Sequence, residues 1–346
     1  MMQPEPALRL AIDSAALAAN YRALDALSGT ARAGAAIKAD GYGVGATKVV
    51  PVLQNAGCAD FFVAHWSEVQ PLIGLIDPRQ ISVLHGPLTA QDAAFAKAIG
   101  VKPTLNSLHQ ARLWLDVGGG PCDLMIDTGI NRLGLPLSAL GDEAVGRLEI
   151  DVLMSHLASA DEDVPLNVVQ QQRWREAAAA TPAKRSSLAN SAGIALGAAY
   201  HGDLTRPGLS LYGGIPRPEL ADHIRQVAQP QAAIMQIREI TAGESIGYNA
   251  TFTAPTAMRV GVIALGYADG YLRCWSGKGA MQADGARLPV LGRVSMDMTV
   301  IDLSAAPQLH EGDWVDVQYA LPEAARCSGL SQYELLTLLG RRFGRN

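Results

Sequence analysis

Residues 35–45 read AAIKADGYGVG, an apolar run that ends in Lys38 and then breaks into glycines around Tyr42. Small apolar residues predict a short buried strand, and the glycines let the following loop approach an anion closely. Barrel enzymes carry their chemistry at such strand ends. Burial lowers the pKa of a lysine, which leaves part of its amine neutral and nucleophilic toward an aldehyde. The segment therefore predicts a reactive lysine, although a surface lysine paired with Asp40 is the ordinary alternative.

The composition predicts a protein with a large core, and we do not expect nucleic acid as its partner. The chain has 346 residues, which predicts about two domains, and 49% of them are hydrophobic, enough for a large core. The net charge is −5, and the lysines and arginines are scattered. A protein that binds a phosphate backbone needs a basic stripe, and this sequence has none.

Cysteine spacing and the N-terminal residues predict a soluble protein of the cytoplasm. The cysteines are far apart and form no C-x-x-C pair, so we expect neither a metal site nor a disulfide framework. The first residues, MMQPEPALRLAID, lack the basic start and apolar stretch of a signal peptide. No segment reaches the roughly 18 uninterrupted apolar residues of a membrane span, so no membrane partner is expected.

Short apolar runs alternate with helical stretches along the first 225 residues. This alternation favours parallel strands joined by helical crossovers, and eight such units close a (β/α)₈ barrel. An open doubly wound sheet is the alternative, but no G-x-G-x-x-G follows the first strand. We therefore predict an α/β fold with a barrel over residues 1–225. Its strands are the Lys38 run, DFFVA at 60–64, ISVLH at 81–85, VKPTL at 101–105, CDLMID at 122–127, EIDVLMSH at 149–156, RSSLAN at 185–190 and DLTRP at 203–207.

The pattern changes near residue 226. Runs such as QAAIMQIREI, AMRVGVIALGY, ARLPVLGRV and MTVIDL are β-type and are divided by Gly, Pro, Asp and Asn. Few helical stretches occur before residues 332–342. We predict a second, β-rich domain over residues 226–346.

The polar residues at the ends of the later strands are of the types that could bind a single ligand. Loops after strands seven and eight usually bind phosphate in such barrels, and the Ser191 hydroxyl with the amides near Gly208 and Leu209 suits its oxygens. Tyr42 can add a phenolic hydrogen bond, and Asn190 lies beside Ser191.

Two further side chains suit a heteroaromatic ring. His156 ends strand six, where it could stack on a flat ring, although a histidine with one satisfied nitrogen is commoner there. Arg206 at strand eight could be a plain ion-pair residue. Facing a pyridine nitrogen, it would donate a hydrogen bond and keep its own proton, so the ring would stay largely neutral.

Eight motifs, in order and over nearly the whole chain, resemble the fold-type III pyridoxal-phosphate enzymes, specifically the alanine racemase family. Any one of them would be a weak signal, whereas the ordered set is highly specific. They are AIKADGYGVG around Lys38, IDTGINRLG at 126–134, SHLASADE at 155–162, LANSAG at 188–193, DLTRPGLSLYG at 203–213, GYNATFTA at 247–254, LGYADGY at 265–271 and GRVSMDM at 292–298.

The resemblance implies a role for each matching residue. Lys38 would hold the aldehyde of pyridoxal 5'-phosphate, Arg206 would face the pyridine nitrogen and His156 would flank the ring. Arg132 would reach the cofactor hydroxyl and the substrate carboxylate, with Met296 near that carboxylate. Tyr248 would be a second base, and the phosphate would be held by Tyr42, Ser191, Gly208 and Leu209. Asn190, beside Ser191, is also expected among the cofactor-binding residues.

Racemisation gives these roles a chemical reason. The cofactor stabilises the negative charge left when an α-proton is removed, and inversion then needs a proton from the opposite face. Two bases are required, here Lys38 and Tyr248. In the resembling family the second base and Met296 come from the neighbouring subunit, which implies a homodimer with shared sites.

Two positions depart from the family pattern. Many members have a carbamylated lysine seven residues before the arginine, where this chain has Met125. We expect a bound chloride or an acidic side chain beside Arg132 instead. Near the C-terminus, where relatives place a phosphate-binding tyrosine, a loose alignment gives Arg341.

The sequence therefore predicts a racemase that interconverts L- and D-alanine and supplies D-alanine for peptidoglycan. A racemase of the same build acting on serine or a larger amino acid is the main alternative, because one methylene discriminates by only about 10–200-fold. A decarboxylase on the same barrel would not need an opposite-face base. A non-catalytic cofactor carrier would need neither Tyr248 nor the β-rich domain.

Overall fold

The chain folds as two compact units. The computed structural model describes residues 5–345. One unit holds Ser14–Arg225, and the other holds Gln226 onward together with the N-terminal residues up to Asp13. Each unit has its own core, and we describe each by itself. Among the described residues, no helix combines the length and the apolar character needed to cross a bilayer.

Residues 14–225 form the predicted (β/α)₈ barrel. Parallel pairing runs without a break from the seventh strand back to the first, in the order β10-β9-β7-β6-β5-β4-β3. Several of these strands read as continuous apolar runs because both faces are buried, as in Phe61–Val63. The barrel strands are β2 (Arg32–Ala33) with β3 (Ala35–Ala36), β4 (Phe61–Val63), β5 (Ile81–Val83), β6 (Lys102–Leu105), β7 (Pro121–Asp127), β9 (Glu149–Met154), β10 (Arg185–Ser187) and β11 (Leu204–Thr205).

The eighth strand closes the barrel. On one side β11 pairs in parallel with β2, and the amides of Gly34 and Ala36 donate to the carbonyls of Thr205 and Pro207 at 2.9 Å each. On the other side the amide of Arg206 donates to the carbonyl of Ala189 at 2.8 Å, beyond the end of β10. The closed sheet leaves no free edge and brings the C-terminal ends of all eight strands to one mouth.

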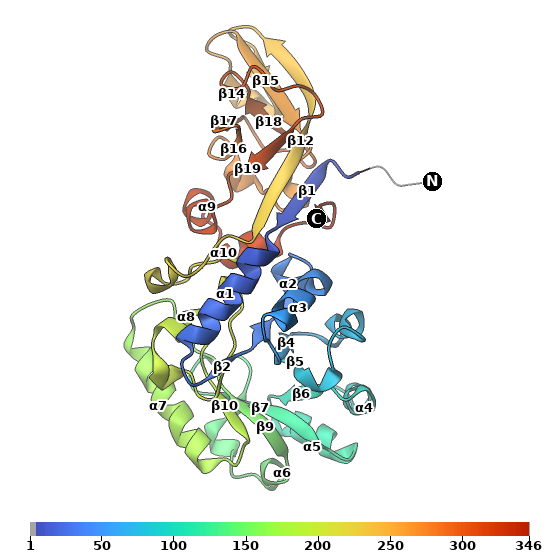
Figure 1. The fold of residues 1–346 in the computed structure, drawn as a ribbon, viewed down its shortest axis with the longest axis vertical. Coiled ribbons are helices and arrows are strands. Elements are labelled where there is room, and N and C mark those ends of the chain that lie inside the picture. Colours follow the sequence, from blue (N-terminus) through green and yellow to red (C-terminus); the bar gives the residue numbers. More distant parts are fainter. Residues whose placement is uncertain (1–4, 346) are drawn as a thin grey trace. The chain divides into compact units, whose positions relative to one another are not determined.

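Helices cover the outside of the barrel, and α1 lies beside α3 and α8 (Figure 1). Tyr21 of α1 is fully buried, and its hydroxyl donates to the carbonyl of Ala33 at 2.9 Å, which fixes the helix to the first strand. A short strand β8 (Leu135–Pro136) pairs with β7. The helices are α1 (Ser14–Leu27), α3 (Ala46–Asn55), α4 (Ala90–Ile99), α5 (Leu108–Asp116), α6 (Glu143–Gly146), α7 (Pro165–Ala180) and α8 (Ser191–Ala195).

The second unit is an antiparallel β-barrel, which confirms the predicted β-rich region. Its strands follow the order β15-β18-β17-β16-β19-β12, and β12 returns to pair with β15. A bulge between Ile234 and Gln236 divides β12, so that it can serve both neighbours. The strands are β12 (Ala228–Ile240), β13 (Ser245–Ile246), β14 (Phe252–Thr253), β15 (Met258–Ile263), β16 (Ala280–Ala283), β17 (Ala286–Leu291), β18 (Thr299–Asp302) and β19 (Trp314–Val317), followed by α9 (Leu321–Ser328), α10 (Gln332–Thr337) and β20 (Gly344–Arg345).

The N-terminal strand belongs to this second unit. The sequence division placed residues 1–225 in one domain, but β1 (Leu8–Ile12) pairs antiparallel with β12 through five residue pairs from Leu8–Ala232 to Ile12–Ala228. In Figure 1 the blue β1 lies along the yellow β12, although more than 200 residues separate them in the chain. The barrel therefore begins at Ser14, and the difference arises because strand pairing, not chain order, decides which core a strand joins.

Candidate active site

Lys38 lies where the first barrel strand ends in an unusual turn. The next five residues all have positive φ, between 53° and 82°, and form a left-handed turn. Glycine adopts this conformation at little cost, but Ala39, Asp40 and Tyr42 each carry a side chain. A left-handed residue of that kind costs about 1–2 kcal/mol, so the surrounding structure must hold the turn in place.

Two carboxylates hold this turn. Asp40 Oδ1 accepts the amide of Ala46 at 2.8 Å, which ties the turn to the start of α3. Glu68, from the short helix that follows β4, accepts the amide of Ala39 through Oε1 at 2.5 Å. Lys38 is thus presented by a backbone fixed from two directions. The alternative of a Lys38–Asp40 pair has no support, because no ion pair joins them in the described residues.

Lys38 lies among positive groups. Burial is the largest cause that lowers its pKa, and the charges of Arg132 and Arg206 lower it further, while Glu68 opposes them. His156 shares this environment. Burial and then the charges of Arg206, Arg132 and Lys38 lower the pKa of His156 to about 3, so its ring is neutral at physiological pH. Lys38, Arg132, His156 and Arg206 thus lie close enough for their charges to act on one another.

Arg206 is anchored inside the barrel. Its Nη1 donates to Ser187 Oγ and its Nη2 to the carbonyl of Ser155 at 2.5 Å. The side chain is only 7% exposed, and Nε has no partner among the described residues. Burial lowers the pKa of Arg206 to about 10, so the guanidinium stays charged at neutral pH. One N–H is thus held in place to meet an acceptor at the mouth.

Ser191, Gly208 and Tyr42 form a compact polar cradle. Ser191 Oγ accepts the amide of Gly208 at 3.0 Å and that of Ser210 at 3.2 Å. Gly208 needs to lack a side chain, since a Cβ there would overlap Tyr42 Oη. The Tyr42 ring stacks on Tyr212 with centroids 4.9 Å apart, which fixes its direction. Leu209 starts the short helix Leu209–Tyr212 at the same place.

The remaining barrel residues have clear positions. Asn190 is the N-cap of α8, and its Oδ1 accepts the amide of Gly193 at 2.9 Å, so that oxygen is committed to the fold. Arg132 is exposed on a loop shaped by Asp127, whose Oδ1 accepts three successive amides from Gly129 to Asn131. Met125 is buried in β7, and no carboxylate pairs with Arg132 among residues 5–345.

Tyr248 and Met296 lie in the second unit and are exposed by 67% and 53%. Tyr248 follows β13 in the loop that leads to β14. Met296 lies in a loop whose carbonyls at Ser295 and Met296 accept the amides of Tyr267 and Ala268, each at 3.0 Å. Gly266 allows this close packing, because a Cβ would overlap the Met296 carbonyl.

The C-terminal arginines differ in their contacts. Arg341 is exposed, and no ion pair or hydrogen bond of its side chain occurs in the described part of the chain. Arg342 instead donates to the fully buried Asp269 at 2.7 Å and to Asp297 at 2.6 Å. It therefore joins the Tyr267–Asp269 segment to the loop of Met296, a contact that the sequence did not reveal.

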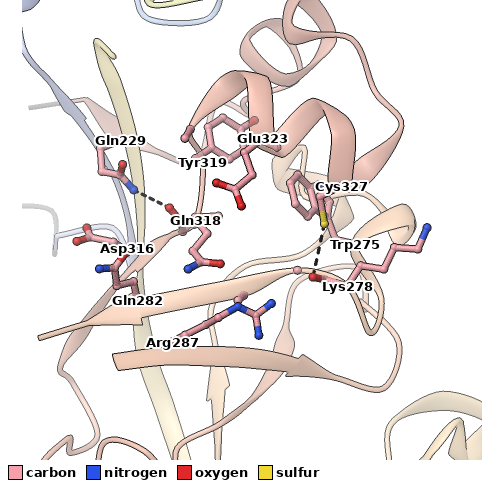
Figure 2. A pocket seen from close by; sticks show the side chains of 15 residues that line it. Gln229, Trp275, Lys278, Gln282, Arg287, Asp316, Gln318, Tyr319, Glu323 and Cys327 are labelled. Carbon is pink, nitrogen blue, oxygen red and sulfur yellow. Dashed lines mark hydrogen bonds between the residues drawn. The ribbon is translucent and has the colours of Figure 1, made fainter. Parts of the chain in front are cut away.

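The second unit also has a polar pocket, which Figure 2 shows from close by. Lys278, Arg287 and Glu323 line it, but all three side chains are exposed. The two hydrogen bonds drawn there, from Gln229 to the Val317 carbonyl and from Cys327 Sγ to the Lys278 carbonyl, join neighbouring elements of the fold. These contacts stabilise the β-rich unit and supply no buried reactive group.

Sequence reasoning missed two groups near Lys38. Glu68 holds the turn, and His85, after β5, lies against His65 with ring centroids 4.1 Å apart. Burial, His65 and Lys38 lower the pKa of His85, and the two histidines follow the C-terminal ends of β4 and β5, on the side of the mouth. Glu68 lies three residues after the N-cap His65, and the serine or threonine that usually marks such a cap is missing.

Comparisons with known proteins agree with this geometry. The model of the alanine racemase N-terminal domain matches residues 12–216, and that of the C-terminal domain matches residues 227–346. A protein of Methylobacterium nodulans named alanine racemase is 41% identical over 98% of this chain and 95% of its own length. A catabolic alanine racemase of Rhizobium johnstonii is also 41% identical, over 97% and 93%. A biosynthetic one of Agrobacterium fabrum is 38% identical, over 98% and 93%.

Solved structures give the same answer. The alanine racemase of Bartonella henselae, described with covalently bound pyridoxal phosphate, superimposes with a TM-score of 0.91 at 32% identity over 99% of both chains. The biosynthetic alanine racemase of Pseudomonas aeruginosa gives a TM-score of 0.88 at 32% identity over 99% of both chains. With both domain models matched and the mouth of its barrel carrying the predicted lysine, arginines and histidine, this chain belongs to the alanine racemase family.

Proposed function

We propose that this protein racemises alanine with pyridoxal 5'-phosphate held at the barrel mouth. The observation that carries the proposal is the convergence of Lys38, Arg206 and His156 within one unit, beside the Ser191–Gly208–Tyr42 cradle. The names of the relatives favour alanine over the serine racemase considered from the sequence.

The residues present fit the cofactor. Ser191 Oγ accepts two amides and so keeps its own O–H to donate to a phosphate oxygen, and the buried Ser210 Oγ has no partner in the described residues. The free N–H of Arg206 suits a pyridine nitrogen, and neutral His156 suits the ring face. When bound, the cofactor delocalises the negative charge left after α-proton removal. A ring nitrogen that meets an arginine stays unprotonated, because arginine keeps its proton.

Two residues of the chain move the proton. Lys38 takes or gives it at Nζ, and the lowered pKa of Lys38 provides the neutral amine that this step requires. Tyr248 acts at its Oη from the opposite face. Arg132 binds the substrate carboxylate as a bidentate partner, and Met296 lies beside that carboxylate. Two bases facing each other make the reaction invert the centre in either direction.

A homodimer completes each site in this proposal. Tyr248 and Met296 are large side chains that lie exposed on the β-rich unit, and Met298 beside them is also 41% exposed. Exposed apolar side chains gathered on adjoining loops are typical of a subunit interface. We propose that these loops enter the barrel mouth of a second copy.

In a bacterial cell such an enzyme would act in the cytoplasm and supply D-alanine for peptidoglycan. Relatives named biosynthetic and catabolic match this chain to a similar degree, so the direction of use is decided by measurement of both rates.

A bound anion is proposed beside Arg132, in place of the carbamylated lysine of other members. Met125 offers no charge there, and Arg132 has no carboxylate partner among the described residues. A bromide soak with anomalous scattering is expected to show an ion beside Arg132. Density without an ion or a carboxylate would refute this assignment.

The visible spectrum tests the proposed function. The purified protein should absorb in the visible range because the cofactor is bound covalently to Lys38, and borohydride should remove the band. Lys38→Ala should lack the band and lose more than about 10⁴-fold in racemisation. A wild-type protein that binds the cofactor but does not interconvert the alanines would overturn the proposal.

A further inference from the structure

Glu68 joins two parts of the barrel mouth through three hydrogen bonds. Its Oε2 accepts the amides of Ala64 and His65, at 2.7 and 3.0 Å, in the loop that follows β4. Its Oε1 reaches across to the amide of Ala39 at 2.5 Å, directly after Lys38. Both oxygens are therefore occupied, and the carboxylate is a bridge from the second strand to the first.

This bridge meets the left-handed turn at its first residue. Ala39 is the first residue with positive φ, at 54°, and its amide would otherwise lack the acceptor that Glu68 provides. Strained turns persist only where neighbouring groups fix them. Asp40 holds the far end of the same turn through the Ala46 amide, so Glu68 and Asp40 clamp it from opposite ends.

Glu68 also supplies the negative charge of this region. The groups that face Lys38 are Arg132 from the loop after β7, Arg206 after β11, His85 after β5, His156 after β9 and Glu68. The two arginines lower the pKa of Lys38, and Glu68 alone raises it. One carboxylate thus opposes the effect of burial and of the two arginines on Lys38.

We propose that Glu68 is a positioning residue for the reaction: it fixes the turn that aims Lys38 and places a carboxylate charge beside that lysine. The inference rests on the proposed role of Lys38. It adds a residue that touches neither the substrate nor the cofactor and acts through the backbone amide of Ala39.

Two variants separate the two effects. Glu68→Gln removes the charge and leaves one acceptor oxygen for donors on two sides, with an NH2 group facing the other side, so the bridge should be lost together with the charge. Glu68→Asp keeps the charge but is one methylene too short to span the bridge. Glu334→Gln is the matched control, because Glu334 accepts the Ser331 amide at 2.8 Å in a similar cap within the other unit.

Two measurements test the proposed roles of Glu68 without relying on enzyme turnover. Hydrogen exchange at the Ala39 amide of the full-length holoenzyme should become about tenfold faster or more in both Glu68 variants. After the cofactor is removed, the pH dependence of pyridoxal 5'-phosphate uptake reports the amine of Lys38. Its midpoint should move to lower pH in Glu68→Gln, since a lost negative charge favours the neutral amine, and should move less in Glu68→Asp.

The outcomes are distinct. Ala39 exchange that stays at the wild-type rate in both folded variants overturns the positioning role, and an uptake midpoint equal to that of Glu334→Gln overturns the charge role. If Glu68→Gln does not fold, Glu68→Asp still decides the first point. Cofactor uptake with an unchanged spectrum in Lys38→Ala would instead refute the proposed function, and the exchange at Ala39 would remain interpretable.

Discussion

The turn after Lys38 and the turn after Tyr248 share a backbone conformation but differ in their support. Ala39 and Asp40 have φ of 54° and 53°, and Asn249 and Ala250 have φ of 63° and 47°. The first turn is clamped by Glu68 and Asp40. The second spans a hairpin of only two residue pairs, β13 and β14, and the Tyr248 hydroxyl has no hydrogen bond among the described residues.

The difference separates a preorganised group from one that needs an outside surface. A catalytic group must be held close to its productive geometry, and neighbours that lock its backbone do this best. Lys38 has those neighbours in its own unit. Tyr248, 67% exposed, does not, and we propose that the second copy of the chain provides them.

Removing the Tyr248 hydroxyl should have the largest effect in this comparison. In Tyr248→Phe we expect racemisation to fall about 10²- to 10⁴-fold in both directions, because an opposite-face acid and base is lost. The visible band of the Lys38-bound cofactor should persist, as the barrel unit is untouched. Assays from L- and D-alanine, with the spectrum of the same sample, check both points. Retained activity would dismiss Tyr248 as the second base.

Adding a side chain at Gly208 tests the Ser191–Gly208–Tyr42 cradle directly. A Cβ in Gly208→Ala would overlap Tyr42 Oη, so the cradle must open. We expect cofactor affinity to fall about 10- to 100-fold, measured by equilibrium titration of the cofactor-free protein. Gly146→Ala is the control, because a Cβ there meets no atom within 4 Å. Equal affinities for the two variants would show that the cradle does not hold the phosphate.

Local patterns explain what the sequence could predict. Most of the barrel strands are short runs rich in apolar residues, and residues such as Lys38, His156 and Ser191 follow the ends of strands. Since parallel strands of a closed barrel present all their C-terminal ends at one mouth, a list of strand ends already indicates which side chains meet. That reasoning predicts which side chains lie near the mouth, and the structure adds the hydrogen bonds among them.

The features that were missed depend on long-range pairing. β1 reads as an ordinary strand, and only its register with β12 assigns it to the second unit. Glu68 contacts Ala39, 29 residues earlier, and such a contact has no local signature. Arg341 and Arg342 are neighbours in an arginine pair, so composition could not indicate which of them binds Asp269.

His156 gives a pH test of the barrel unit. Burial, Arg206, Arg132 and Lys38 lower its folded pKa to about 3, whereas an unfolded histidine titrates near 6.5. The unfolded state therefore binds an extra proton between these values, and the free energy of unfolding should fall as pH decreases from about 6.5 to about 3. In His156→Gln, denaturant titrations of the cofactor-free protein should show a shallower decrease. Identical slopes for both proteins would place His156 outside the cationic cluster.

Replacing Arg342 should have the smallest effect, and it tests how well the Met296 loop of the second unit is supported. It joins Asp269 to Asp297 and so supports the loop of Met296, but its side chain is 49% exposed. The Asp297 pair is exposed and contributes little, and the buried Asp269 keeps the Gly266 amide at 3.0 Å when the arginine is replaced. Arg342→Gln should therefore raise KM for alanine only about two- to fivefold and leave cofactor affinity unchanged. Arg326→Gln, an exposed arginine of α9, is the control. The effect should lie in KM because Met296 is proposed to lie beside the substrate carboxylate. If kcat fell and KM stayed constant, the loop would support the second base instead, and the contrast between an ordered Met296 loop and an unsupported Tyr248 loop would no longer hold.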